Sequence, residues 1–455
     1  MKFFHVVFLL TFVGPLTLQA QSFIIDDAES FADFSMGKNN DRLTCFYKTW
    51  NSDKKSSHYR SISFDGDLTI TDTISYRLNG ICSNLGSGEN ENYLYHIFHT
   101  QLAGKEVITF LVTDKSGKVL ATYEKTAEDF KPFFKRGVKK LSELQFNTTK
   151  TQGQDDEILL LEPRLFTKSG MLKARGCWFA LDMLTGTLKW QMKMPVTFYR
   201  AKTTRGRLIA LQIDPRSGLL SAHYYSLNTG DELKIVPLQP RSGSRQISVF
   251  EVDSSKVILA GSEFEKNNAS NKHGRYFLTQ FDLSGNRIFD RVDTVDRLSG
   301  NRLQLLGGAF GPDGDLVILG ESYKLDATNV VAGTAASIAL SVLVRSPNVI
   351  MPKARQIVQE LVSARISPTG DFLEFHRFPV DHRNEFSRMI KDDRQVYLRY
   401  KDQLWLYDLR NISNPPRRFT RISPTDDLVI FSGNLIGIGK DDKKKEIILR
   451  KISGL

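Results

Sequence analysis

The chain has 455 residues, of which 41% are hydrophobic and 25% are charged, and its formal net charge is +11. This composition excludes a largely disordered chain and supplies enough apolar residues for a large core. The positive charge favours anionic partners such as lipopolysaccharide, acidic glycans or nucleic acid, as an argument about association only.

The first expected element, residues 1–20, has an early cation at Lys2, an apolar run broken at Gly14 and Pro15, and a compact stretch ending at Ala20. This pattern is typical of a secretory signal peptide cleaved near Ala20. A membrane anchor is the alternative, but spanning a bilayer needs about 20 uninterrupted apolar residues. We therefore expect a mature chain without a transmembrane segment, secreted or in the periplasm of a Gram-negative type envelope.

Pairs of alternating apolar runs separated by a short polar turn recur from residue 61 onward. In each turn an Asp, Asn or Thr precedes or adjoins a Gly, which supplies the positive φ that a tight hairpin requires. Six such hairpins and a seventh with a longer, proline-containing loop occupy residues 61–70, 109–123, 178–191, 224–236, 277–291, 364–378 and 403–422. Further strand-like runs between them supply the first two strands of each unit.

The hairpins recur at intervals of about fifty residues, a period typical of propellers. One four-stranded blade buries neither face alone, so blades stack radially. We predict an all-β fold, a single β-propeller of four-stranded blades over residues 21–455, with eight blades and seven as the alternative. The last unit, 427–452, supplies three strands, and the segment 21–27 is expected to pair with it and close the ring.

The histidines and cysteines of the chain are the candidate metal ligands. Within a strand, residues three apart point to opposite faces, so His96 and His99 are not expected to share a metal. Cys45, Cys82 and Cys177 lack the close C-x-x-C spacing of metal sites. A disulfide between Cys45 and Cys82 is compatible with this cysteine count, with Cys177 as a buried thiol. No metal site is predicted.

The densest basic segment, residues 131–140, interleaves two phenylalanines with five cations. A nucleic-acid or membrane surface built from it would bind with an affinity that falls steeply with salt. An exposed edge with inward-facing aromatic rings explains the pattern more simply. Nucleic acid is therefore not the expected partner.

Residues 180–190 carry the pattern Ala-x-Asp-x-x-Thr-Gly-x-x-x-Trp, formed by Ala180, Asp182, Thr185, Gly186 and Trp190. The pattern resembles the repeat signature of the quinoprotein-like propellers. The resemblance implies that the small Ala lets blades approach, that Asp and Thr tie the turn, that Gly forms the turn and that Trp packs between neighbouring blades.

The resemblance is weaker in the other units. In the hairpin 224–236, Thr229 and Gly230 keep their places, and the remaining hairpins keep little more than the Gly. The class includes dehydrogenases that bind pyrroloquinoline quinone with calcium, and cofactor-free members such as the periplasmic scaffold of outer-membrane protein assembly. The dehydrogenase site implied by the resemblance has adjacent cysteines, a stacking Trp, and Glu, Asn and Asp on calcium. This sequence has no adjacent cysteines, so we predict a diverged propeller without a cofactor.

Residues 325–360 interrupt the repeat with an insertion of about thirty residues. Five apolar residues near its end fit helical spacing and predict one short helix before the next strand, namely Ala354, Ile357, Val358, Leu361 and Val362. Long insertions are functional or mobile more often than ordinary connections. The apolar character of this one is compatible with packing on the propeller face or with docking a partner.

The best polar constellation contains His376, Asp381, His382 and Arg383, at the junction to the next unit. Blade-connecting loops reach the end faces of a propeller, so these are candidate ligand-binding residues, with a solvated turn as the alternative. No G-x-S-x-G, H-E-x-x-H or P-loop motif occurs. We therefore expect a non-catalytic binding or scaffold module for a protein or an envelope glycan.

An enzyme is the alternative function. Its site would lie in the central channel and would be assembled from single residues of several blades, which leave no local motif. The two enzyme classes that fit this alternative are a quinone-dependent dehydrogenase and a glycan-active hydrolase.

Overall fold

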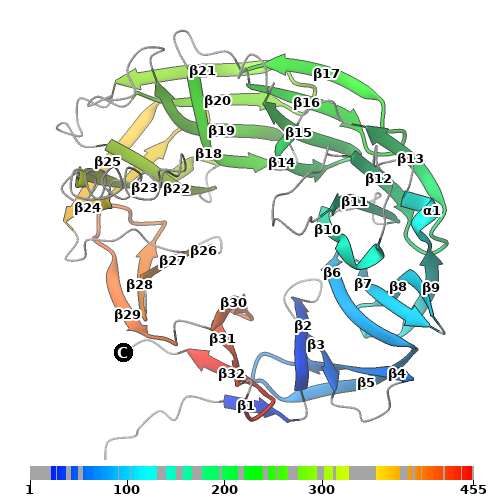
Figure 1. Ribbon diagram of the computed structural model, residues 1–455. Coiled ribbons are helices and arrows are strands. Elements are labelled where there is room, and N and C mark those ends of the chain that lie inside the picture. The colour runs from blue at the N-terminus through cyan, green and yellow to red at the C-terminus, as the bar shows by residue number, and fades with distance from the viewer. Residues whose placement is uncertain are drawn as a thin grey trace, which may run out of the picture.

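The computed structural model of the chain is a ring of eight antiparallel four-stranded sheets (Figure 1). The eight-bladed β-propeller expected from the sequence is confirmed. The structure describes residues 22–26, 28–36, 42–49, 55–90, 92–102, 104–130, 140–149, 157–165, 177–193, 197–213, 220–238, 244–252, 255–264, 275–294, 302–310, 314–326, 355–379, 388–391, 395–400, 402–423, 426–441 and 443–452.

The first four blades follow one another along the chain. Blade 1 contains β2 (Ala28–Met36), β3 (Leu43–Thr49), β4 (Ser56–Phe64) and β5 (Ile70–Asn79), and blade 2 contains β6 (Ile81–Glu89), β7 (Tyr93–Leu102), β8 (Lys105–Asp114) and β9 (Val119–Lys125). The helix α1 (Ala127–Phe130) and the 3-10 turn η2 (Leu141–Glu143) precede blade 3. Blade 3 contains β10 (Leu144–Thr149), β11 (Ile158–Leu165), β12 (Cys177–Asp182) and β13 (Leu188–Lys193), and blade 4 contains β14 (Thr197–Thr204), β15 (Arg207–Ile213), β16 (Leu220–Ser226) and β17 (Glu232–Pro237).

The remaining blades repeat this order, except that the last one borrows a strand. Blade 5 contains β18 (Ser244–Val252), β19 (Lys256–Phe264), β20 (Arg275–Asp282) and β21 (Arg287–Thr294), and blade 6 contains β22 (Arg302–Phe310), β23 (Leu316–Asp326), β24 (Arg355–Ile366) and β25 (Phe372–Pro379). Blade 7 contains β26 (Arg388–Lys391), β27 (Gln395–Tyr400), β28 (Gln403–Asp408) and β29 (Arg417–Arg421), and blade 8 contains β30 (Asp427–Phe431), β31 (Asn434–Asp441), β32 (Glu446–Ile452) and β1 (Ser22–Ile25).

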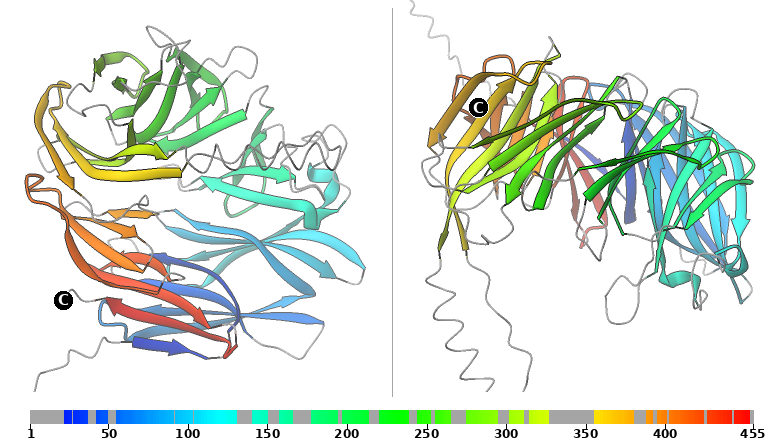
Figure 2. Two further views of the ribbon diagram at one scale, coloured as in Figure 1. Left: turned by 60° about the vertical axis from the view of Figure 1, so that its left-hand side comes forward. Right: turned by 90° about the horizontal axis from the view of Figure 1, so that it is seen from above.

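Strand sequence follows position in the blade. The second strands carry long runs of consecutive buried residues, as in β7 and β11, because both of their faces meet a neighbouring blade. The fourth strands alternate exposed and covered residues, as β9 does, because they lie at the rim. The right-hand view of Figure 2 shows the ring from the side.

The N-terminal strand closes the ring as expected. β1 pairs antiparallel with β32, with Ser22 opposite Arg450 and Ile25 opposite Ile447. Ile25 is buried in a cluster that joins blade 8 to blade 1 through Phe64 and Phe431. The predicted signal peptide, 1–20, lies outside the described residues.

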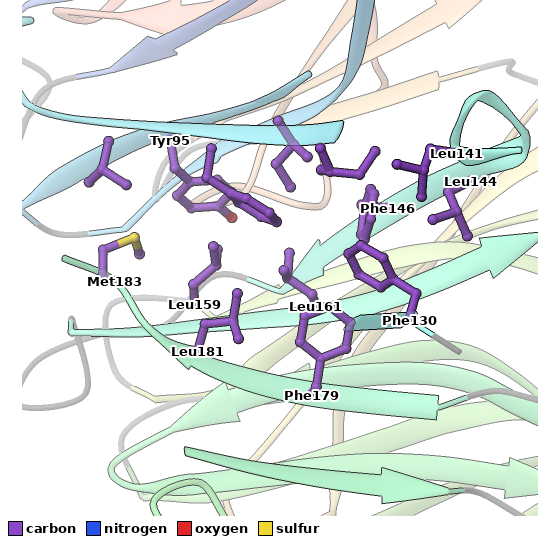
Figure 3. Packing of buried hydrophobic residues seen from close by; sticks show 14 residues of the cluster. Tyr95, Phe130, Leu141, Leu144, Phe146, Leu159, Leu161, Phe179, Leu181 and Met183 are labelled. Atoms are coloured by element: carbon purple, nitrogen blue, oxygen red, sulfur yellow. The ribbon is translucent and has the colours of Figure 1, made fainter. Parts of the chain in front are cut away.

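The core consists of apolar clusters between blades. The cluster in Figure 3 joins blade 2 to blade 3, and Tyr95 on β7 faces Leu159 and Leu181 of blade 3. Phe130 of α1 is also part of this cluster, so the short helix packs against both sheets.

The helix expected near residue 355 is wrong, because β24 begins at Arg355 and pairs along its whole length with β23. Val358 lies opposite Tyr323 and Glu360 opposite Ser322, which leaves Gln359 as an extra residue in a bulge. A bulge shifts the in-out alternation by one residue, and this shift produced the helix-like spacing of the apolar side chains. The rest of the insertion, 327–354, lies outside the described residues.

Candidate functional site: the loop face of the ring

The strands within each blade alternate in direction, so equivalent connections of all blades lie at the same end of the ring. The links from second to third strands, and the links between blades, leave from one end, which we call the loop face. The opposite end carries the hairpins between third and fourth strands, and we call it the turn face. Three links of the loop face are long, 166–176, 265–274 and 327–354, whereas the same links in blades 2 and 7 are 103–104 and 401–402.

The signature residues of blade 3 lie at the turn face and have a structural role. Asp182 accepts hydrogen bonds from the backbone N–H of Thr185 at 2.9 Å and from its hydroxyl at 2.9 Å. Burial alone would raise the pKa of Asp182, but these bonds and the charge of Lys189 outweigh it and hold the pKa below its usual range. Gly186 has a φ of 68°. The turn is therefore fixed by the residues that the signature names.

Trp190 connects this turn to the next blade. Its indole Nε1 donates a 2.6 Å hydrogen bond to the carbonyl of Leu227 in the turn of blade 4. A Cβ atom on Gly230 would lie 2.8 Å from the indole ring, so only glycine fits above it. Ala180 is fully buried in the same cluster between blades 3 and 4.

The proposed ligand residue His376 lies within β25, on the outer strand of blade 6, rather than in a connecting loop. Its Nε2 atom is 3.2 Å from Glu374 Oε2, and Glu374 Oε1 is 3.3 Å from Arg365 Nε. Arg365 also donates to the carbonyls of Leu409 and Arg410 in blade 7. His376 thus belongs to a chain of polar contacts that joins blade 6 to blade 7.

The other three candidate ligand residues, Asp381, His382 and Arg383, lie outside the described residues, as does most of the basic segment 131–140. The role of this group in ligand binding stays a prediction.

His96 and His99 are both buried in β7 and are directed to different borders. His96 stacks on Phe46 of blade 1 with ring centroids 3.6 Å apart, whereas His99 Nε2 lies 3.6 Å from Glu106 Oε2. Burial lowers the pKa of His96 to about 3, so its ring is neutral. The structure therefore does not bring the two histidines together.

A buried charge cluster lies near the loop face within blade 5, on the side of the sheet that packs against blade 4. Arg245 Nε donates to Glu263 Oε2 at 2.9 Å, and both side chains are 1% exposed. Arg245 also pairs with Asp290 at 3.3 Å, and its guanidinium carbon lies 4.4 Å from the centre of the Phe277 ring. The second link of this blade, 265–274, begins two residues after Glu263.

Two more clusters fix strand ends at the same face. In blade 6, Arg377 pairs with Glu360 at 2.6 Å, and Ser322 donates to the same carboxylate at 2.9 Å. In blade 7, Arg399 donates to the carbonyls of Asp426 and Ser423 in the link to blade 8. The strand ends at the loop face are thus held by buried and partly buried ion pairs and charge-assisted hydrogen bonds.

A hydrogen-bonded chain runs along blade 4 from Ser221 to Glu232. Ser221 Oγ lies 2.8 Å from His223 Nε2, and His223 Nδ1 lies 3.0 Å from Glu232 Oε2. The Tyr225 hydroxyl also contacts His223 Nδ1, at 3.2 Å, and is itself held by Gln212 at 2.8 Å. Burial is the main cause that raises the pKa of Tyr225 to about 12.

The cysteines and the tryptophan do not fit the quinone cofactor. Cys45 lies in the cluster between blades 8 and 1, Cys82 lies between blades 1 and 2, and the two are buried thiols rather than a disulfide. Trp190 is buried between blades 3 and 4, with its indole ring against Gly230. In the described part of the chain no three His, Cys, Asp or Glu side chains are placed to hold a metal ion. The same residues include no helix with the length and apolarity to cross a membrane.

Sequence reasoning missed the charged residues at the loop face. Arg245 and Glu263 lie near the ends of apolar strands, where a charged residue is usually predicted to be exposed to solvent. A charged residue inside the end of a second strand, as Glu263 is in β19, was the available signal.

The chain matches no model of a known protein family and no curated protein. Among solved structures it is similar to the dihydro-heme d1 dehydrogenase NirN in complex with DHE, at 12% identity over 95% of this chain and 78% of that one, with a TM-score of 0.46. It is similar to Sqt1 of Saccharomyces cerevisiae at 10% identity over 95% and 98%, with a TM-score of 0.43. A third is the β-propeller domain of the Trilobed protease from Pyrococcus furiosus, at 7% identity over 81% and 93%, with a TM-score of 0.40. These likenesses concern the propeller fold alone.

Proposed function

We propose that the protein is a secreted or periplasmic scaffold, a non-catalytic propeller whose loop face binds a protein or an envelope glycan. The observation that carries the proposal is the coincidence at one end of the ring of the long links 166–176, 265–274 and 327–354 with charge clusters, one buried and one partly exposed, that fix the strand ends. Binding residues are often placed on loops that a rigid scaffold positions. The repeat signature at 180–190 supports grouping with the cofactor-free quinoprotein-like propellers.

The test compares loop-face and turn-face variants of the mature chain, residues 21–455. Each of the long links is replaced by a short Gly-Ser linker, and the matched control replaces residues 151–156 in the link between β10 and β11 at the turn face. We expect photo-cross-linking in the producing cell's envelope, and binding to an array of envelope glycans, to be lost in a loop-face variant and kept in the control. Equal binding by all folded variants would reject the proposal.

Localisation is tested by the N-terminus of the processed protein. We expect Edman sequencing of chain recovered from a periplasmic or secreted fraction to start at Gln21. Recovery only of chain with residues 1–20 attached would favour a membrane anchor instead.

One arrangement favours a second candidate function, hydrolysis. The order Ser221, His223 and Glu232 matches nucleophile, base and acid. The contacts of Tyr225 and Gln212 give the same residues a structural explanation, a fully satisfied cross-strand network. Under the scaffold proposal a fluorophosphonate probe does not label the protein, and labelling that disappears in Ser221→Ala would support the hydrolase.

A further inference from the structure

The outer strand of blade 7, β29, has the sequence RRFTR and no acidic residue. Arg417, Arg418 and Arg421 are all exposed. Within the described part of the chain, no hydrogen bond or ion pair holds any of the three guanidinium groups. β29 therefore presents three uncompensated cations at the rim of the ring.

The outer strands of three other blades pair a cation with a carboxylate. On β13, Lys189 lies 3.5 Å from Asp182, and on β21, Arg291 lies 2.8 Å from Asp371 of the next blade. On β25, Arg377 is paired with Glu360 at 2.6 Å. A neighbouring carboxylate is thus supplied repeatedly by the blade architecture, and β29 departs from this pattern.

The register of β29 places its arginines on both faces of the sheet. Arg417 lies opposite Leu406, and Arg418 lies opposite Trp405. Because directly paired residues share a face and consecutive residues on β28 alternate, Arg417 and Arg418 point to opposite faces. Arg421, opposite Gln403, shares the face of Arg418.

This distribution selects among anionic partners. A polyanion lying against one face of blade 7 reaches the arginines of that face only. A strand that pairs with the free edge of β29 lies in the plane of the sheet, and its side chains reach both faces. β29 is the last strand in its sheet, so that edge is available within the described structure.

We propose that β29 binds an extended acidic peptide segment of a partner protein, which adds to blade 7 as a fifth strand. Main-chain hydrogen bonds fix the added strand, and its carboxylates form charge-assisted bonds with Arg417, Arg418 and Arg421. This rim surface is separate from the loop face, so the inference does not depend on the function proposed above.

The probe is a fluorescein-labelled peptide, Val-Glu-Thr-Thr-Glu-Glu-Val, whose acidic residues are spaced to meet the three arginines in an antiparallel strand. Its binding to the mature chain is followed by fluorescence anisotropy at two salt concentrations. The control peptides carry Gln in place of Glu, or Pro in place of the central Thr, which removes a main-chain donor. We expect binding of the acidic peptide only, and weaker binding at higher salt.

Variants test the two faces separately. Arg417→Gln is expected to weaken binding about fivefold, and Arg418→Gln with Arg421→Gln more than about tenfold, as expected for one and two partly exposed ion pairs. The matched control, Lys443→Gln with Lys444→Gln, removes two other exposed cations and is expected to change affinity less than about twofold. Unchanged melting temperatures show that all variants fold.

Four results would overturn the proposal. The first is equal loss of affinity in the Lys control, which would indicate net charge alone. The second is full binding of the Pro peptide, which would exclude strand addition. The third is displacement of the peptide by heparin or oligothymidylate, together with a loss of affinity in the variants of one face only. This result would indicate a polyanion that lies against that face. The fourth is self-association of the Arg variants with unchanged peptide affinity, which would show that the arginines only guard the edge.

Discussion

Two neighbouring blade borders solve the same packing problem with different residues. Between blades 3 and 4, Trp190 lies beneath the turn glycine Gly230 and donates a hydrogen bond to the turn carbonyl. Between blades 4 and 5, Lys234 occupies the corresponding place beneath Gly285, and its amine donates to Asn286 at 2.7 Å. The first contact is apolar and rigid, and the second is a flexible chain with a polar end.

The second border also has charged groups near it at the loop face. There, Arg245, Glu263 and Asp290 of blade 5 form a largely buried cluster on the side of the sheet that packs against blade 4. These ion pairs connect strands of one blade, so they fix the sheet that forms the border. The two blades are joined directly by Lys202, which pairs with Glu251 at 2.7 Å.

The largest expected difference follows from removing the residue beneath the glycine. Trp190→Ala should lower the free energy of unfolding by about 3–5 kcal/mol, because a buried aromatic ring leaves a cavity. Lys234→Ala should lower it by less than about 1 kcal/mol, since a long flexible side chain contributes little. Urea unfolding at pH 7 measures both, and similar losses would contradict the distinction between the two borders.

The buried ion pair offers a test from the other end of the ring. Arg245→Leu should cost about 3 kcal/mol, because it leaves Glu263 buried without its cation. Adding Glu263→Leu should recover part of that loss, since a pair of apolar residues avoids the desolvation penalty. Asp290 keeps Thr279 and Arg287 as partners in the double variant. A double variant less stable than the single one would contradict this account.

A third border adds a dependence on pH. His96, between blades 1 and 2, has its pKa lowered to about 3 by burial, so it is neutral in the folded state. As pH falls below the ordinary value of about 6.5, the unfolded chain gains a proton and the folded chain does not. Stability from this group is therefore present above about pH 6.5 and is lost towards pH 3.

His96→Phe keeps a ring against Phe46 and removes the titration. The variant should lack the part of the wild-type stability loss that His96 causes, about 2 kcal/mol between pH 6.5 and pH 5. Chemical unfolding at four pH values tests this prediction. The control variant is His376→Phe, which replaces a partly exposed histidine. Equal slopes for wild type and His96→Phe would show that His96 does not stay neutral.

The sequence predicted the repeat better than it predicted the borders. Turn glycines and alternating strands are local features, so the seven hairpins and the pairing of the N-terminal strand could be read directly. The Trp of the repeat signature predicted one border contact, that of Trp190 between blades 3 and 4. Rings of different kinds fill the same place elsewhere, with Tyr123 beneath Gly186 and Phe289 beneath Gly370.

The candidate site was harder to predict for a physical reason. Burial of Arg245 depends on which residues its strand meets across the blade and in the neighbouring blade, and no local pattern carries that information. His376 was placed at the junction to the next unit, but β25 continues to Pro379 and His376 lies within the strand. Single-chain patterns thus fix strands and turns, whereas contacts between blades decide which polar residues are buried.

The smallest effect tests whether the glycine and the residue beneath it act together. Gly230 and Gly285 both have positive φ, 75° and 74°, so alanine at either should cost about 1 kcal/mol from the backbone. At Gly230 the new Cβ also meets the Trp190 ring at 2.8 Å, whereas at Gly285 it meets Lys234, Tyr224 and Val236 at 3.1 Å. Gly230→Ala should therefore cost about 1 kcal/mol more than Gly285→Ala. In a Trp190→Ala background that excess should disappear, because the ring that the Cβ meets is gone, and a persisting excess would place its cause in the turn itself.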